Sequence, residues 1–186
     1  MVNELSDKEL VAKFKVPAEK QDAFKLLLSR YSSKVYWQVR RIVIDHDDAD
    51  DVVQNTFIKV WEKLSEFRED SQFYTWLYRV ATNEALAFLN KKKANLNISM
   101  EELQVQLSEG LTSSSYFDGN KLEMVLQQAI LGLPEKQRLV FNMRYYGNLK
   151  YEEMEAILGT SVGGLKASYH HAVKKIELIV KQSLNH

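Results

Sequence analysis

Apolar residues recur every three or four positions through most of the chain, and this spacing predicts amphipathic helices. In one stretch the apolar positions are Val53, Phe57, Val60, Trp61, Leu64 and Phe67. The next stretch repeats the pattern with Phe73, Leu77, Val80, Ala81, Ala85 and Phe88. No segment alternates apolar and polar residues for long enough to predict a strand. The first part of the chain is therefore predicted to be a helical bundle.

Start and stop signals give the expected ends of the first helices. Ser6 followed by Glu9 fits a capping box, in which each residue bonds to the other's backbone amide. Pro17 suits the first turn of a second, long helix that runs to about Ile44. The polar run 45–47 is expected to end that helix.

The last third of the chain predicts four shorter helices: one near 120–132, one from Pro134 to about 146, one from about 150 to 158, and one after Ser161. Gly159 is expected to end the third of these, and Ser161 to cap the fourth. The apolar face of the fourth helix consists of Leu165, Tyr169, Ala172, Ile176 and Ile179. Two helices joined through this short turn are typical of a helix-turn-helix.

Composition narrows the class of protein. With 186 residues, 45% hydrophobic and 27% charged, the chain predicts one or two folded domains and excludes wholesale disorder. The absence of cysteine excludes disulfides, thiolate zinc sites and cysteine nucleophiles. No apolar run is long enough for a membrane span, and the N-terminus is too charged for a signal peptide. We therefore expect a soluble cytoplasmic protein.

The net charge is zero, from 25 basic and 25 acidic residues, but it is unevenly distributed. Residues 1–95 carry +1, residues 96–120 carry −4 with no basic residue, and residues 121–186 carry +3. We predict two helical domains, 1–95 and 121–186, joined by a flexible acidic linker at 96–120. Proteins that hold duplex DNA by charge alone usually have a pI above about 9. This chain, with a pI of about 6.9, is not expected to do so.

The sequence lacks a recognisable catalytic centre. It has no Gly-rich phosphate loop, nucleophile elbow or HExxH pattern. His46 stands beside Asp45, Asp47 and Asp48, but acids at the start of a helix are expected from its macrodipole alone. We predict no metal, no cofactor, no small-molecule substrate and no enzymatic activity.

Two clusters of residues could instead bind nucleic acid. On the last helix, opposite the apolar face, lie Gly163, Lys166, Ala167, His170 and Lys174, with His171 beside them. Their small, hydrogen-bonding and basic side chains suit base edges and phosphates, although a plain solvated face has the same composition. The second cluster contains Phe73, Tyr74, Trp76 and Tyr78, with Arg68, Arg79 and Asn83 nearby. Such aromatic residues can stack on unpaired bases, but core packing explains them equally well.

Three motifs in order extend over most of the chain. Residues 48–57 read D-A-D-D-V-V-Q-N-T-F, residues 67–83 read F-R-E-D-S-Q-F-Y-T-W-L-Y-R-V-A-T-N, and L-P-E-K-Q-R at 133–138 precedes the helix-turn-helix. In this respect the chain resembles an extracytoplasmic-function (ECF) sigma factor, the smallest class of the sigma-70 family. The resemblance implies a transcription initiation factor with core RNA polymerase and promoter DNA as partners. An anti-sigma factor, membrane-bound in many relatives, is a further candidate partner.

The resemblance also implies roles for individual residues. Binding to the clamp helices of the polymerase is implied for Asp48, Asp50, Asp51, Gln54 and Phe57. Binding to the melted minus-ten strand is implied for Arg68, Asp70, Ser71, Tyr74, Trp76, Arg79 and Asn83. Reading the duplex minus-thirty-five element is implied for Arg144, Gly163, Lys166, Ala167, His170, His171 and Lys174. The acidic linker would run towards the active-site and RNA-exit channels of the polymerase.

The chain departs from the family pattern in its last helices. Ser168, His171 and Val173 replace three arginines, so phosphate contacts and their salt dependence are expected to be weaker. Lys150 replaces a serine cap, a loss of about 0.5–2 kcal/mol unless another group caps the helix. Two alternatives stay open: a free-standing helix-turn-helix regulator, and a sigma-like protein that sequesters a partner.

Overall fold

The computed structural model describes residues 5–99, 102–103, 105–107, 109 and 121–184. Every regular element assigned in these residues is a helix, which confirms the all-α fold class. In chain order they are α1 (Asp7–Phe14), α2 (Lys20–Val43), α3 (His46–Lys63), the short 3₁₀ helix η1 (Leu64–Glu66), α4 (Phe73–Leu96), α6 (Lys121–Leu131), α7 (Glu135–Tyr145), α8 (Tyr151–Leu158) and α9 (Val162–Leu184). None of the helices within the described ranges is both long and apolar enough to cross a membrane.

Helices α1 to α4 form a bundle whose ends follow local signals. The Ser6 hydroxyl accepts from the Glu9 amide and the Glu9 carboxylate accepts from the Ser6 amide, so the capping box is confirmed. The prediction for Pro17 was wrong, because α2 begins at Lys20 and Pro17 lies in the turn before it. Hydrogen-bonded turns over residues 13–19 reverse the chain after α1, which leaves no room for helix there.

The core of this bundle contains the predicted apolar positions. Phe57, Val60, Leu64, Phe67, Phe73, Leu77, Ala81 and Ala85 are buried, while Val53, Trp61, Val80 and Phe88 pack at its edge. Helix α3 ends at Lys63, so Leu64 enters the core from the 3₁₀ turn instead. At the other end of α3, the Asp45 side chain caps the helix by accepting from the Asp48 amide at 3.0 Å.

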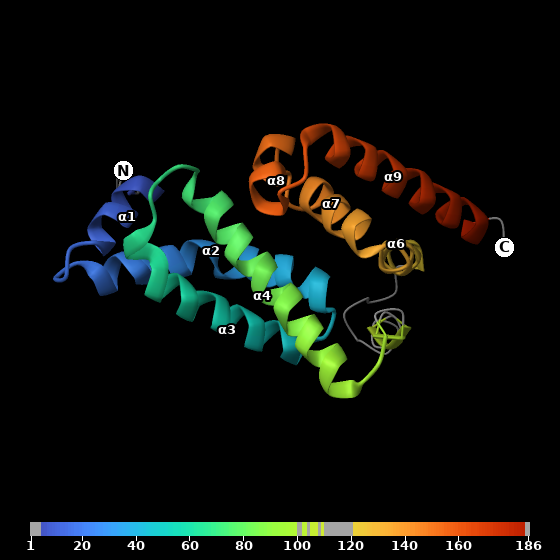
Figure 1. The fold of residues 1–186 in the computed structure, drawn as a ribbon, viewed down its shortest axis with the longest axis horizontal. Helices are drawn as coiled ribbons and strands as arrows, with labels where there is room; N and C mark the ends of the chain where they lie inside the picture. The colour runs from blue at the N-terminus through green and yellow to red at the C-terminus, as the bar shows by residue number, and fades with distance from the viewer. Residues whose placement is uncertain (1–4, 100–101, 104, 108, 110–120, 185–186) are drawn as a thin grey trace.

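Helices α6 to α9 form the second helical part (Figure 1). Gly159 ends α8 in the left-handed conformation, with φ of 62°, and the Ser161 hydroxyl accepts from the Gly164 amide at 3.3 Å. Leu165, Ala172 and Ile176 on α9 are buried, as their spacing predicted.

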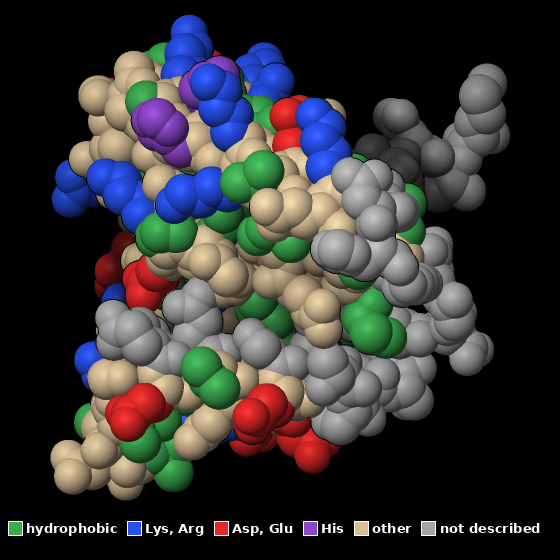
Figure 2. Space-filling view, turned by 90° about the vertical axis from the view of Figure 1, so that its right-hand side faces the viewer, with side chains coloured by type: hydrophobic (Ala, Val, Ile, Leu, Met, Phe, Trp, Pro, Cys, Tyr) green, Lys and Arg blue, Asp and Glu red, His purple; other side chains and the backbone are tan. Residues whose placement is uncertain are grey.

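The two helical parts are in contact through α8 on α4 and α7 on α2 (Figure 1). Within the predicted acidic linker, residues 102–103, 105–107 and 109 are helical, and Leu103 and Leu107 are buried in the core of the first bundle. Residues 110–120 lie outside the described residues, so the flexibility of the linker and the domain boundaries stay predictions. Figure 2 shows a face on which lysine, arginine and histidine gather at one end and acidic side chains at the other. The basic end agrees with the net charge of +3 on residues 121–186, whereas the acidic end does not follow from the net charge of +1 on residues 1–95.

Candidate functional site

A strained loop connects η1 to α4 and carries the first predicted strand-binding residues. Phe67 anchors the loop, with its ring centroid 5.2 Å from that of Trp76 and 6.3 Å from that of Phe73. Glu69 has φ of 61°, a left-handed conformation that costs a non-glycine residue about 1–2 kcal/mol. The Lys15 ammonium stabilises this shape, because it donates to the Phe67 carbonyl at 3.3 Å and lies 3.8 Å from the Glu69 carboxylate.

One side of this loop borders a cavity of about 250 Å³, which we call the loop cavity. It is lined by Lys63, Glu66, Phe67, Arg68, Asp70, Ser71, Trp76 and Arg79. Five of the seven residues predicted to bind the minus-ten strand are thus brought together. An indole wall, two guanidinium groups and the polar loop offer a stacking surface, phosphate partners and hydrogen-bonding groups in one place. Tyr74 and Asn83 are not among the lining residues.

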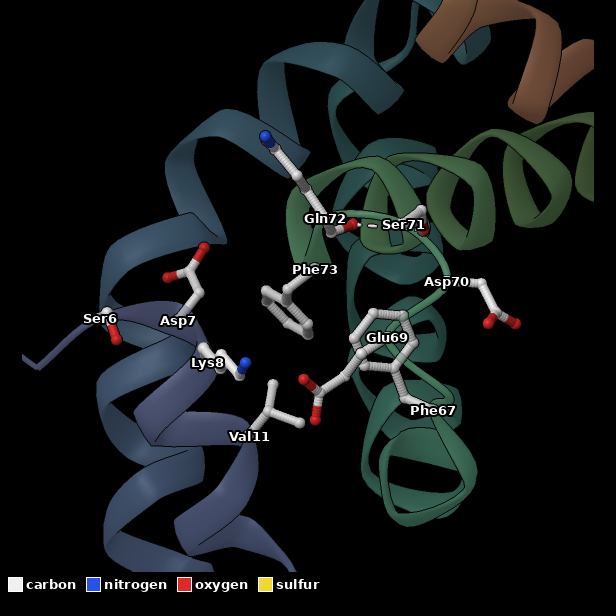
Figure 3. A pocket seen from close by; sticks show the side chains of 10 residues that line it. All are labelled: Ser6, Asp7, Lys8, Val11, Phe67, Glu69, Asp70, Ser71, Gln72 and Phe73. Atoms are coloured by element: carbon white, nitrogen blue, oxygen red, sulfur yellow. Dashed lines mark hydrogen bonds between the residues drawn. The ribbon is translucent and has the colours of Figure 1, made fainter.

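A second cavity, of about 590 Å³, lies on the α1 side of the loop (Figure 3). Asp7 and Lys8 of α1 face Glu69 and Gln72 across it. The Asp7 carboxylate accepts hydrogen bonds from Arg30 at 2.6 Å and from the Tyr31 hydroxyl. Sequence reasoning missed the α1 residues, because about sixty positions separate them from the loop and no local motif links the two segments.

The aromatic residues further along α4 have mixed environments. Tyr74 is half-buried and stacks on Tyr31 with centroids 5.6 Å apart, while Asn83 is exposed. Tyr78 is buried, and this burial raises the pKa of its hydroxyl. Gln38 fixes this turn of α4 to α2 by donating to the Tyr78 carbonyl and to the Thr82 hydroxyl, both at 2.8 Å. Tyr78 therefore has a packing role in this structure.

The predicted recognition face of α9 is open to solvent. Gly163, Lys166, Ala167, His170, His171 and Lys174 are all exposed. Helix α8 is buried through Met154 and Ile157, in the same cluster as Leu165 of α9. This packing fixes the helix-turn-helix and leaves the face opposite to it available to a ligand.

Two residues next to the helix-turn-helix have local partners. Arg144 is half-buried, donates to the Leu149 carbonyl at 2.8 Å and stacks over the Tyr151 ring at 5.2 Å. It therefore stabilises the α7–α8 turn in the absence of DNA. The Lys150 amide donates to the Glu153 carboxylate at 2.7 Å, so the Glu153 half of a capping box is present, whereas Lys150 has no hydroxyl to accept from the Glu153 amide as a serine would.

A groove between α2 and α3 brings together the predicted polymerase-binding residues. Its volume is about 690 Å³, and it is lined by Phe24, Leu28, Ser32, Asp50, Asp51, Val53, Gln54, Phe57, Ile58, Trp61 and Glu62. Ile58 is 51% exposed and Leu28 39%, and both line this one groove together with Phe57 and Trp61, so they form a patch of exposed apolar surface. We call this surface the docking groove: an apolar floor with an acidic rim, suited to a helix with apolar and basic side chains.

One predicted docking residue has a different environment. Asp48 forms an ion pair with Lys92 of α4 and is not among the residues of the docking groove. The histidine nearby is also locally bonded, since His46 Nδ1 lies 2.7 Å from the Tyr36 hydroxyl. Among the described residues, no group of three or more histidine, aspartate or glutamate side chains is placed to hold a metal ion.

Comparison with known proteins identifies the family. Residues 27–95 match the family model for sigma-70 region 2, and residues 123–176 match that for sigma-70 region 4. The chain is 32% identical over 185 residues to the ECF RNA polymerase sigma-E factor of Haemophilus influenzae, covering 95% of this chain and 96% of that one. It is 34% identical over 185 residues to the sigma-E factor of Escherichia coli strain K12, covering 95% of each.

Solved structures support the same fold. The complex of CnrH with the cytosolic domain of CnrY matches with a TM-score of 0.69 at 22% identity, covering 95% of this chain and 97% of that one. The sigma factor RpoE in complex with the anti-sigma factor NepR, from Bartonella quintana, matches with a TM-score of 0.66 at 23% identity, covering 85% of this chain and 96% of that one. The region 2 and region 4 matches, in this order and over these helices, show that the chain belongs to the ECF class of the sigma-70 family of RNA polymerase sigma factors.

Proposed function

We propose that this sigma factor directs core RNA polymerase to promoters by binding the melted minus-ten strand at the loop cavity. The observation that carries the proposal is the convergence of Arg68, Asp70, Ser71, Trp76 and Arg79 on this one cavity. An unpaired base stacks on an aromatic ring for about 1–3 kcal/mol, and guanidinium groups suit the phosphates on either side of it. Tyr74 and Asn83 would extend the same surface along α4.

The docking groove is the proposed site for core polymerase. Exposed Leu28 and Ile58 offer apolar area, and Asp50, Asp51 and Glu62 offer negative charge around it. A helix with apolar and basic side chains, such as the clamp helices implied by the family, would bury both. Asp48 would then act indirectly, by holding α3 against α4 through Lys92.

The exposed face of α9 is the proposed reader of the minus-thirty-five duplex. Gly163 at the start of the helix leaves space for a close phosphate approach, since nothing lies within 4 Å of the position that its Cβ would take. Lys166 and Lys174 suit phosphates further along, while Ala167, His170 and His171 suit base edges. Arg144 would contact phosphate only by giving up its bond to the Leu149 carbonyl.

The remaining expectations complete the proposal. The protein would work in the cytoplasm and would itself catalyse no reaction, because the polymerase performs the chemistry. Both solved relatives are complexes with a second protein, one of them named an anti-sigma factor. We therefore include an anti-sigma factor among the proposed partners of this chain.

Run-off transcription from genomic fragments, with core polymerase alone and with core plus this protein, tests the proposed function. New transcripts that require the protein are expected. If the protein binds core tightly but no new promoter is used, initiation is refuted and the sequestering alternative gains support. Specific promoter binding by the isolated protein would favour the free-standing regulator instead.

A further inference from the structure

The loop between η1 and α4 keeps a backbone conformation that its sequence does not favour. Among the described residues, the non-glycine positions with positive φ are Ile44, Glu69, Asn97 and Asn148. Asparagine tolerates this conformation, whereas a glutamate adopts it rarely. Backbone strain of this kind persists where surrounding contacts impose it, and it is concentrated at functional sites. Glu69 stands between Arg68 and Asp70 of the proposed strand-binding surface, so the contacts that impose its conformation also shape that surface.

One ammonium group from the turn between α1 and α2 holds the loop on both sides of Arg68. Lys15 Nζ donates to the carbonyl of Phe67, the residue before Arg68, at 3.3 Å. The same nitrogen lies 3.8 Å from a carboxylate oxygen of Glu69, the residue after it. An exposed ion pair alone contributes little to stability, and these two side chains are 40% and 38% exposed. The restraint on the loop therefore depends on both contacts being made by one group.

The two cavities beside the loop divide its side chains at this point. Arg68 lines the loop cavity, whereas Glu69 lines the cavity on the α1 side, and Asp70 lines both. Figure 3 shows the Glu69 carboxylate on the α1 side and the Asp70 carboxylate pointing away from it. A rotation of the Glu69 φ to a negative value would turn Arg68 and Asp70 relative to each other. The shape of the loop cavity therefore depends on the left-handed conformation of Glu69.

We propose that Lys15 is a positioning residue for the melted strand: it holds Glu69 in the left-handed conformation and thereby directs Arg68 to the loop cavity. This inference rests on the proposed role of that cavity in binding the strand. Lys15 lines neither cavity, so it acts through the loop and not by touching DNA. It lies 52 positions before Phe67, and the motif of the loop therefore does not include it.

Trypsin cleavage after Arg68 tests the positioning without DNA. A protease cuts a loop when the segment opens locally, so the bond should be cut slowly while Lys15 holds it. Lys15→Met should raise the rate of this cut about three- to tenfold, which corresponds to about 0.7–1.4 kcal/mol of lost restraint. Lys25→Met is the matched control, because it removes an exposed ion pair of similar length, 3.7 Å to Asp22, away from the loop. Equal rates for the two variants, measured by mass spectrometry of the fragments, would overturn the inference.

A glycine at position 69 provides a sharper test, because glycine adopts positive φ without strain and should not need Lys15. In the Glu69→Gly background, Lys15→Met should change the rate of the same cut by less than about twofold. The comparison is made within that background, since Glu69→Gly alters the cleaved bond itself. Lys15→Arg keeps a cation and should resemble the unmodified protein. An equal effect of Lys15→Met in both backgrounds would overturn the inference, because lysine would then not act through the conformation of Glu69.

Promoter melting connects the positioning to function. The probe is a promoter fragment that gives a run-off transcript, labelled with 2-aminopurine in its minus-ten element, with core at saturation. Lys15→Met should lower open-complex formation about three- to tenfold, and the Lys15→Met, Glu69→Gly double variant should recover to within about twofold. Core binding should not change, because Lys15 is not in the docking groove. Unchanged melting by Lys15→Met would overturn the inference and leave the proposed function intact. If no promoter gives a transcript, the proposed function is refuted, and the cleavage rates still decide whether Lys15 positions the loop.

Discussion

Replacing Trp76 with alanine should separate promoter opening from polymerase binding. The indole is half-buried, lines the loop cavity, and lies 5.2 Å from the Phe67 ring and 6.0 Å from the Phe73 ring, centroid to centroid. It is absent from the docking groove, whose lining comes from α2 and α3. Truncation therefore removes a wall of the loop cavity and leaves the proposed polymerase contact in place.

The structure sets the size of the expected loss of stability and of the expected loss of promoter opening. Each aromatic pair contributes about 0.5–1.5 kcal/mol beyond area burial, so Trp76→Ala should lower the free energy of unfolding by about 2 kcal/mol. For a chain of this size the midpoint of thermal unfolding would fall by roughly 4–8 °C. Loss of one base stack costs about 1–3 kcal/mol. At 1.4 kcal/mol per factor of ten, open-complex formation should fall about 5- to 150-fold.

The assay uses core at saturation and a promoter with 2-aminopurine in the minus-ten element, so that fluorescence reports melting. Binding to core is measured in parallel by anisotropy of a labelled protein, and folding by circular dichroism. Trp76→Phe keeps an aromatic face and should recover most of the activity. Equal loss of polymerase binding and promoter melting would refute the reasoning, since Trp76 would then serve only to pack the hydrophobic core of the protein. Normal melting by Trp76→Ala would refute it as well.

Three further predictions concern the docking groove, the recognition helix and alkaline stability. Ile58→Asp should weaken core binding at least tenfold, by equilibrium binding, because it puts charge on the apolar floor; Leu26→Asp, at a 50% exposed position outside the groove, should not. In transcription assays, Lys166→Ala should reduce dependence on the minus-thirty-five element, whereas Lys181→Ala, further along α9, should not; unchanged promoter choice would contradict the role of Lys166. Burial raises the folded-state pKa of Tyr78 above its usual 10.0, so its contribution to stability is complete below about pH 10 and is lost as the pH rises further. Urea unfolding between pH 8 and 11 should show this decline, and Tyr78→Phe should make it shallower.

The sequence predicted the candidate sites unevenly. Five residues of the minus-ten set, all within one motif, do line a single cavity, because a short loop followed by the first two turns of α4 keeps sequence neighbours close in space. The opposite cavity escaped prediction because its α1 wall, with Asp7 and Lys8, is distant in sequence. Asp48 belongs to the docking motif, yet it points to Lys92, since residues of one helix face different neighbours.

The sequence by itself determined the helices, their caps and the helix-turn-helix, because apolar periodicity and end signals act over a few residues. The tertiary structure decided which neighbours the residues of the turns and of the helix surfaces contact. Pro17 lies in the turn that reverses the chain, Ile58 lines a groove between α2 and α3, and Tyr78 lies in the apolar cluster that joins α4 to α7 and α8. Such contacts join residues far apart in the chain, and one helical face can meet solvent, another helix or DNA with the same pattern of side chains. Only the tertiary structure shows that α8 packs on α4 and that Arg79 donates a hydrogen bond to the Ala156 carbonyl of α8.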